Sequence, residues 1–355
     1  MKFTLVSIGD NVQSARTNEE FYKEMLEQVT LAEELGFDEY WVAEHHFSDY
    51  GLVPNPANLL SAMAVRTSKI RLGSGVSILP YRDPLQVAEE YAMVDVISNG
   101  RLNFGAGRGF LVHEYERYGL DSQEKSRGLF NEALDIILKA WEGQPFTYDG
   151  KYHQVKHETK LQITPVQKPL PNVHIAALSP QSFEAAARRG FGISGVIVSV
   201  QQFEAVKGII DNYKKVYAET QGKSAEGMEF PFVFYTAVTN KGKEYEEGGR
   251  YLEYYFRFLA NFFNPAQVAH MDPGTVGFYT QMHNYCKTVT FEQIQQQTDM
   301  AVIGDPEHVI EKIKKMESIG VTMMGQHYNF GNMPRERVMD SMRLFAREVM
   351  PAFRN

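Results

Sequence analysis

Eight short apolar segments alternate with amphipathic segments along almost the whole chain of 355 residues. The apolar segments are near-continuous runs, which is typical of parallel strands covered on both faces. Eight βα units match a closed (β/α)8 barrel, whereas a doubly wound open sheet usually has fewer. We therefore predict one α/β barrel domain over residues 1–355. Its strands are Lys2–Ile8, Glu39–His45, Lys69–Ser77, Arg101–Arg108, Val173–Leu178, Ile193–Val200, Pro231–Val238 and Val321–His327.

Capping signals support the helices predicted between these strands. Thr17 and Glu20 have the spacing of a capping box, and Gly36 ends the apolar stripe that follows. Asp83-Pro84 places an N-cap acid before a proline suited to the first helical turn.

A long insertion follows the seventh predicted strand, over roughly residues 240–300. It begins with an aromatic helix, Tyr251–Phe263. In a barrel an insertion at this point lies over the C-terminal mouth, where active sites occur, so we expect a lid. The alternative for the aromatic helix is a buried dimer face.

Composition narrows the function classes. Charged residues make up 23% of the chain and the net charge is -8, which argues against a nucleic-acid-binding surface. No apolar run is long enough to cross a bilayer, and MKFTLVSIGD lacks the features of a signal peptide. Cys286 is the only cysteine, which excludes an internal disulfide and a cysteine-based zinc site. We expect a cytoplasmic protein that binds neither nucleic acid nor membrane.

The segment Glu44-His45-His46-Phe47 ends the second predicted strand. Because side chains alternate along a strand, His45 should share its face with Trp41, while Glu44 and His46 face the other way. Adjacent histidines cannot readily bind one metal ion, so we predict no metal site. Catalytic groups emerge at the C-terminal ends of barrel strands, where His45 could move protons near neutral pH. A structural role for His45 is the alternative.

The segment Phe104–Gly109 ends the fourth predicted strand. Its spacing is G-x-G-x-G, which is not the dinucleotide motif G-x-G-x-x-G. Glycines such as Gly107 would let a ligand approach the backbone, and Arg108 offers a bidentate fork for a phosphate. The alternative is an ordinary turn with a solvated arginine.

Three further positions could contact a phosphate or a flat ring. The segment Ser179-Pro180-Gln181-Ser182 opens a helix whose free N–H groups could bind an anion, or it caps the helix and does no more. Arg127, near the start of an earlier helix, could supply a second cation or lie on the surface. The small residues around Gly75-Val76 leave room for a ring system, or they reflect tight packing.

Taken together, these segments resemble the bacterial luciferase family, and especially its catalytic alpha subunit. The resemblance covers nearly the whole chain and keeps order and spacing. It rests on MKF, GFDEYWVAEHHFSDYGL, LGSGVSILP, NGRLNFGAGRG, GDPEHVIEKI and SMRLFAREVMP. It implies a (β/α)8 barrel, reduced FMN as co-substrate and dioxygen as oxidant.

The resemblance also implies roles for individual residues. His45 matches the family's catalytic histidine. The residues at cofactor-binding positions are Gly75, Val76, Gly107, Arg108, Arg127, Ser179 and Ser182. Gly75-Val76 matches a pair joined in the family by a non-proline cis peptide, and Gly107 stands where the alpha subunit has a reactive cysteine.

The activity implied is that of an FMN-dependent monooxygenase. It would oxidise a small organic substrate, for example an aldehyde, through a flavin hydroperoxide. A flavin reductase would supply the reduced FMN, and a homodimer is expected. Two alternatives remain: a deazaflavin-dependent hydride-transfer enzyme of the same superfamily, and a flavin-binding protein without catalytic activity.

Overall fold

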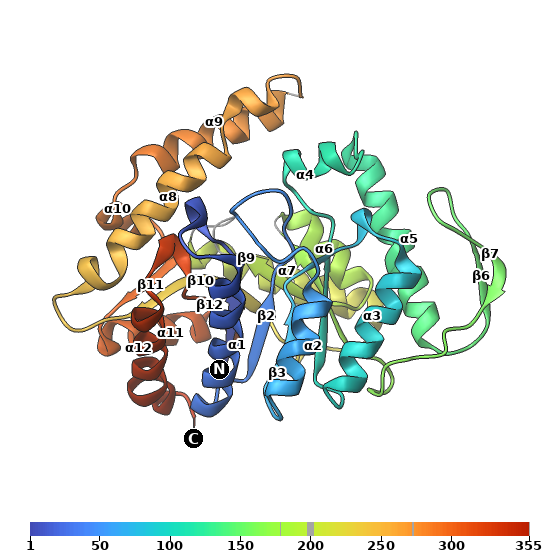
Figure 1. Cartoon of the computed structure of the whole chain (residues 1–355), viewed down its shortest axis with the longest axis horizontal. Helices are drawn as coiled ribbons and strands as arrows, with labels where there is room; N and C mark the ends of the chain where they lie inside the picture. Colours follow the sequence, from blue (N-terminus) through green and yellow to red (C-terminus); the bar gives the residue numbers. More distant parts are fainter. Residues whose placement is uncertain (178, 197–201, 272, 355) are drawn as a thin grey trace.

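The computed structural model describes residues 1–177, 179–196, 202–271 and 273–354. Eight parallel strands close into a barrel, with helices around it (Figure 1). Strand β9 pairs with β10 and β12 pairs with β1, so the ring has no open edge. This confirms the predicted (β/α)8 barrel. In order around the ring, the strands are β1 (Lys2–Ser7), β2 (Glu39–Val42), β3 (Arg71–Ser74), β5 (Leu102–Gly107), β8 (Asn172–Ala177), β9 (Gly192–Val196), β10 (Pro231–Val238) and β12 (Met323–His327).

The helices around the barrel begin at the expected capping residues. Thr17 and Glu20 form a capping box, and the Asp83 side chain accepts hydrogen bonds from two N–H groups of the next helix. Among the described residues, no helix is both long and apolar enough to span a membrane. The surrounding helices are α1 (Asn18–Leu35), α2 (Pro56–Arg66), α3 (Pro84–Ile97), α5 (Gln123–Trp141), α6 (Pro180–Arg188), α7 (Phe203–Gln221), α11 (Pro306–Ser318) and α12 (Arg335–Leu344).

Some strands end earlier than predicted. β2 stops at Val42, three residues before His45, because the backbone there turns to other partners: Glu44 donates its N–H to the Val76 carbonyl. The predicted strands Val173–Leu178 and Ile193–Val200 are found as β8 and β9. Leu178 and residues 197–200 lie outside the described residues.

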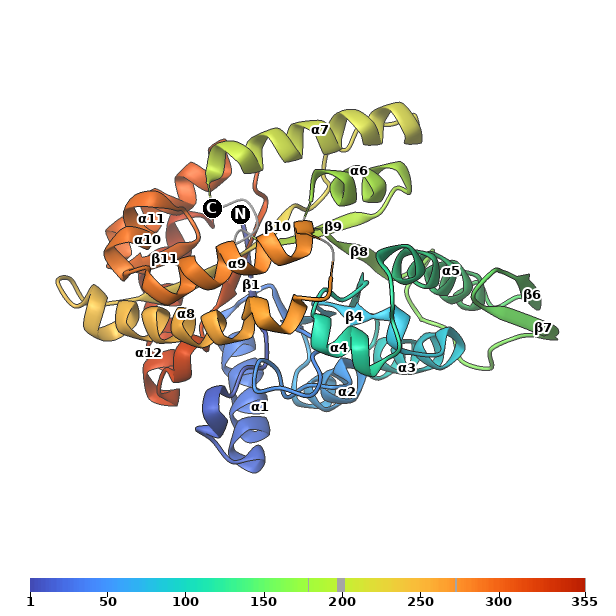
Figure 2. The same ribbon diagram turned by 90° about the horizontal axis from the view of Figure 1, so that it is seen from above.

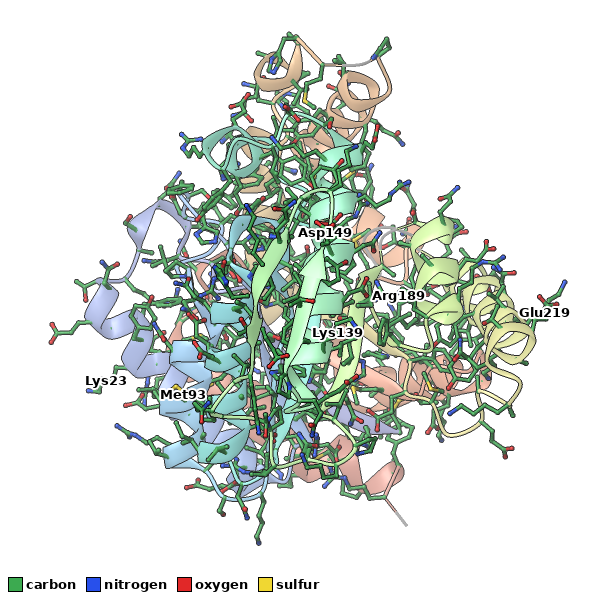
Figure 3. The ribbon with its side chains drawn as sticks, turned by 90° about the vertical axis from the view of Figure 1, so that its right-hand side faces the viewer. Lys23, Met93, Lys139, Asp149, Arg189 and Glu219 are labelled. Carbon is green, nitrogen blue, oxygen red and sulfur yellow. The ribbon has the colours of Figure 1, made fainter. Side chains whose placement is uncertain are left out.

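Four strands were not predicted from the sequence. β4 (Ser77–Ile78) pairs with β5, and β11 (Ala301–Gly304) pairs with the second half of β10. β6 (Phe146–Asp149) and β7 (Gln154–Thr159) form an antiparallel hairpin beside α5 (Figure 3). The hairpin lacks an apolar run because most of its residues are exposed or half-buried.

The insertion after β10 contains α8 (Arg250–Phe262), α9 (Pro273–Thr288) and α10 (Phe291–Gln297). Seen from above, α8 and α9 run side by side across the end of the barrel, and α4 (Val112–Arg117) lies beside them (Figure 2). The aromatic helix α8 buries Tyr255 and Phe256 within its own chain, where both rings contact Tyr235 of β10.

Candidate active site

The His45 side chain is buried at the mouth of the barrel and paired with a carboxylate from another element. Its Nδ1 atom lies 3.2 Å from Oε1 of Glu114, which is fully buried on α4. Because an ionised carboxylate can only accept, Nδ1 carries the proton of this hydrogen bond. In the described part of the chain, His45 Nε2 makes no hydrogen bond, so this nitrogen is the one able to exchange a proton.

Glu114 gathers three donors. It accepts hydrogen bonds from the His45 ring, from the His46 N–H at 2.8 Å and from the Tyr81 hydroxyl at 3.2 Å. Burial alone would raise the pKa of Glu114, but the hydrogen bonds and charge of His45, together with the His46 N–H, hold it below its ordinary value. Burial and then the charge of Glu114 raise the pKa of Tyr81. Glu114 is therefore ionised at neutral pH, and Tyr81 is a neutral donor.

His46 differs from its neighbour because both of its ring nitrogens are engaged. Nε2 lies 3.1 Å from Oε1 of Glu44, and Nδ1 lies 3.1 Å from the Tyr118 hydroxyl. Oε2 of Glu44 accepts from the Ser77 hydroxyl and the Ile78 N–H. This arrangement leaves His46 no ring nitrogen for chemistry and ties the segment to β4. Structure and sequence thus agree that His45 and His46 have different surroundings.

Gly75 and Val76 lie between β3 and β4 and are joined by a cis peptide bond, as the family resemblance implies. Gly75 also lines a small cavity of about 50 Å³ inside the barrel, whose walls are almost entirely apolar. The cavity residues are Thr4, Val6, Ile8, Trp41, Gly75, Ser194, Pro231, Val233 and Gly325. Gly75 therefore borders an apolar space inside the barrel.

The glycines of β5 have close protein neighbours. A Cβ atom at Gly105 would lie 2.0 Å from the Ser74 carbonyl oxygen, and one at Gly107 would lie 2.5 Å from Val76 Cγ2. Their lack of a side chain thus lets β5 approach β3 and the Gly75–Val76 peptide. Gly105 and Gly107 are therefore needed for packing within the protein, in addition to any room they leave for a ligand.

Arg108 directly follows β5 and is brought next to the start of α5. The Ser126 hydroxyl is 3.4 Å from the Arg108 carbonyl oxygen and 3.1 Å from the Tyr115 hydroxyl, which also contacts that carbonyl. Arg127 follows Ser126 in the first turns of α5 and is exposed. The fold therefore places the backbones of the two predicted phosphate-binding arginines close together.

Ser179 and Ser182 open α6 at the same edge of the barrel. Ser179 is the N-cap, and the two residues form a reciprocal capping box. β8, which precedes them, pairs in parallel with β5, which precedes Arg108. The serines and Arg108 consequently emerge side by side. Both hydroxyls take part in the cap, as the simpler interpretation of the sequence expected.

Sequence reasoning missed several polar residues of this site. Glu114 lies in a helix of six residues, and no motif links it to His45. Tyr81 and Tyr118 stack on each other with ring centroids 4.2 Å apart. No sequence motif identified either tyrosine as a site residue. Only their proximity in space reveals them.

Known proteins of similar sequence place this chain in a family. The family described as luciferase-like monooxygenase matches residues 1–323. The oxygenase component of flavin-dependent trigonelline monooxygenase from Acinetobacter baylyi is 27% identical over 99% of this chain and 96% of its own length. The chain spans 61% of the length of another relative, uncharacterized protein y4vJ of Sinorhizobium fredii, at 33% identity.

Solved structures agree with this assignment. Monooxygenase RslO1 from Streptomyces bottropensis has a TM-score of 0.80 and 26% identity, with full coverage of both chains. An F420-dependent secondary alcohol dehydrogenase shares the fold at a TM-score of 0.76 and 18% identity. The predicted class, a monooxygenase enzyme, is confirmed by the relatives named as monooxygenases, among them the trigonelline enzyme and RslO1. The chain belongs to the luciferase-like monooxygenase family.

Proposed function

We propose that this enzyme uses reduced FMN and dioxygen to insert one oxygen atom into a small organic substrate. The observation that carries the proposal is the His45–Glu114 pair beside the Gly75–Val76 peptide. Glu44, which precedes His45, donates its N–H to the Val76 carbonyl, so the backbone fixes the two features relative to each other. An aldehyde is the substrate class that the sequence resemblance suggests.

The residues at the mouth fit FMN. Its phosphate would be held by Arg108 and Arg127 and by the N–H groups at the start of α6, which neutralise negative charge without a metal. Its ring would lie against the Gly75–Val76 peptide, beside the apolar cavity that Gly75 borders. Reduced FMN bound there supplies the electrons that activate dioxygen.

Each protein group then has a defined task. Glu114 fixes the His45 ring with the proton on Nδ1, so that Nε2 can take up or release a proton near the reacting atoms. The insertion of α8 and α9 covers the mouth and excludes water, which protects reactive species from hydrolysis. No residue of this set needs to bind a metal ion.

The test is isotopic. The purified protein is supplied with FMN, NADH, a flavin reductase and ¹⁸O₂, together with a panel of aldehydes, sulfonates and ketones. We expect one ¹⁸O atom per molecule of product from at least one substrate class. A deazaflavin-dependent enzyme would instead transfer hydride anaerobically, and a non-catalytic flavin-binding protein would give no product. Either of those results would refute the proposal.

The proposed partners are a flavin reductase and a second copy of the chain. A patch of exposed apolar side chains on the neighbouring helices α2 and α3 supports the homodimer. Val65, Met93, Val96 and Ile97 are each between 42% and 74% exposed, and Figure 3 labels Met93. Apolar side chains gathered on one face favour burial against another surface. We further propose that the enzyme is cytoplasmic.

A further inference from the structure

The apolar cavity that Gly75 borders extends along the inside of the barrel. Its volume is about 50 Å³. Thr4, Val6 and Ile8 alternate along β1 and just beyond its end, so all three face the same side, which is the inside of the barrel. Thr4 lies near the start of β1, whereas Ile8 follows β1 and Gly75 follows β3. The cavity therefore leads from the barrel interior toward the C-terminal ends of the strands.

Two small residues account for this space. Bulky branched side chains usually fill the interior of a (β/α)8 barrel. Here Gly325 of β12 and Ser194 of β9 line the interior instead. A Cβ atom at Gly325 would lie 3.1 Å from Val233 Cγ2 and 3.2 Å from Val6 Cγ2, so the space is narrow at this point. An unfilled space in a core lowers stability and calls for an explanation.

The cavity suits neither water nor an organic substrate. A buried water needs about two to four polar partners. Among the described residues that line the cavity, Thr4, Trp41 and Ser194 have polar side chains. The Thr4 hydroxyl is fully buried, and the Trp41 N–H donates to Glu39 at 2.6 Å, which leaves the Ser194 hydroxyl. Pockets for organic ligands usually measure about 300–1,000 Å³. The space therefore fits a small apolar molecule.

We propose that this cavity holds dioxygen beside the flavin ring. Dioxygen is small and apolar, and apolar cavities stay dry and take up apolar atoms such as xenon. Gly75 belongs both to the wall of the cavity and to the peptide against which the ring is proposed to lie. Dioxygen held there meets the ring more often than dioxygen that arrives from bulk water. The proposal rests on the proposed function, because it assigns the place from which the oxidant of that reaction comes.

Methyl NMR of the flavin-free, full-length chain under dioxygen pressure tests the cavity directly. Dioxygen is paramagnetic, so it speeds the relaxation of the methyl protons that it approaches. We expect a relaxation enhancement at Val6 and Val233 at least about threefold larger than at the buried Val302 and the exposed Val166. The same spectra under nitrogen give the reference rates. Enhancements at Val6 and Val233 no larger than at the other two valines would overturn the proposal.

Variants that fill the cavity should exclude dioxygen. In Ser194→Leu we expect the enhancement at Val6 to fall to the level of Val302. Val233→Leu adds bulk from a different strand and should lower the enhancement at least about twofold, so the test does not depend on the folding of one variant. Val166→Leu adds the same methylene group at an exposed position and should behave as wild type. An enhancement at Val6 that persists in both filling variants would refute the assignment.

The reaction of the bound flavin connects the cavity to chemistry. The complex of the protein with reduced FMN is mixed with dissolved dioxygen, and the flavin absorbance is followed. Ser194→Leu should bind FMN as the wild type does, yet its flavin should be oxidised at least about threefold more slowly. A Ser194→Leu variant that loses FMN affinity would show that the space belongs to the flavin ring, which would also overturn the proposal.

The NMR measurement is independent of the oxygenation test, because it needs neither flavin nor organic substrate. A protein that incorporates ¹⁸O but shows no enhancement at Val6 and Val233 would keep the proposed function and lose the dioxygen cavity. A protein that shows the enhancement but forms no oxygenated product would keep a cavity that takes up dioxygen and lose the proposed function.

Discussion

His45 and Glu114 are 69 residues apart in the sequence, and their side chains meet at 3.2 Å in the buried mouth of the barrel. The contact fixes which ring nitrogen of His45 carries hydrogen. It also stabilises the ionised form of Glu114, which burial by itself would disfavour. His45 and Glu114 therefore act as a unit.

Replacement of His45 should separate binding from turnover. In His45→Ala we expect FMN affinity within about twofold of wild type and product formation lowered by about 10²-fold or more, which is the usual contribution of general acid–base catalysis. Flavin fluorescence titration and product yield measure the two quantities. The exposed His157→Ala variant serves as control. Normal turnover in His45→Ala would make His45 a structural residue.

Glu114→Gln should reduce turnover about tenfold while keeping the volume of the side chain, because hydrogen bonds to a charged partner contribute roughly 1.5–3 kcal/mol. The same variant predicts a pH effect on stability. The pKa of Glu114 is lowered on folding, so its contribution is present above the ordinary carboxyl pKa, about 4.3, and is lost as pH falls through the lower folded value.

Thermal melts across pH measure this effect. The wild type should melt above Glu114→Gln at neutral pH, and the gap in Tm should close as pH falls below the ordinary carboxyl range. A gap that stays constant down to the lowest pH at which the protein folds would contradict an ionised Glu114.

The two arginines should discriminate FMN from riboflavin, which lacks the phosphate. We expect Arg108→Gln and Arg127→Gln each to weaken FMN binding about tenfold and to leave riboflavin binding unchanged, because charge-assisted hydrogen bonds to phosphate are lost. Calorimetric titration with both flavins provides the measurement. Arg188→Gln, at the far end of α6 from Ser179, is the control. An equal loss for both flavins would show that the arginines do not contact the phosphate.

The patch on α2 and α3 should hold two copies of the chain together. In the double variant Met93→Glu and Val96→Glu, we expect a monomer, because charges buried in an apolar interface are costly. Light scattering after size-exclusion chromatography measures the mass. Phe278→Glu, which alters an exposed apolar residue of α9, should remain dimeric. A wild type that is monomeric at all accessible concentrations would refute the homodimer.

The lid should depend on a small apolar cluster between α4 and the insertion. This cluster buries Tyr279 of α9 against Val112 of α4 and against Val268, which precedes α9. Tyr279→Ala removes the largest of these side chains, so we expect faster proteolysis within residues 265–288 and more reduced FMN consumed per product formed. Limited proteolysis and the ratio of NADH to product test this. If the ratio of NADH to product stays as in the wild type, the cluster does not control lid closure.

The sequence by itself determined the barrel and the positions of Arg108 and Ser179 directly after two of its strands. Strands covered on both faces appear as apolar runs, and helix caps follow local rules. The eight strands of the ring and the starts of α1, α3 and α6 could therefore be predicted. Arg108 and Ser179 could be placed at one edge because parallel strands end on the same side.

Tertiary structure alone decided which of these residues act together. Glu114 gains its role only because α4 folds back over His45. Thr4 and Gly325 stand near opposite ends of the chain and line one cavity because closure of the barrel pairs β1 with β12. Glycine is required at Gly105 because the Ser74 carbonyl lies against it. Local periodicity encodes strands and helices, but contacts between distant residues depend on how those elements pack, which no local pattern specifies.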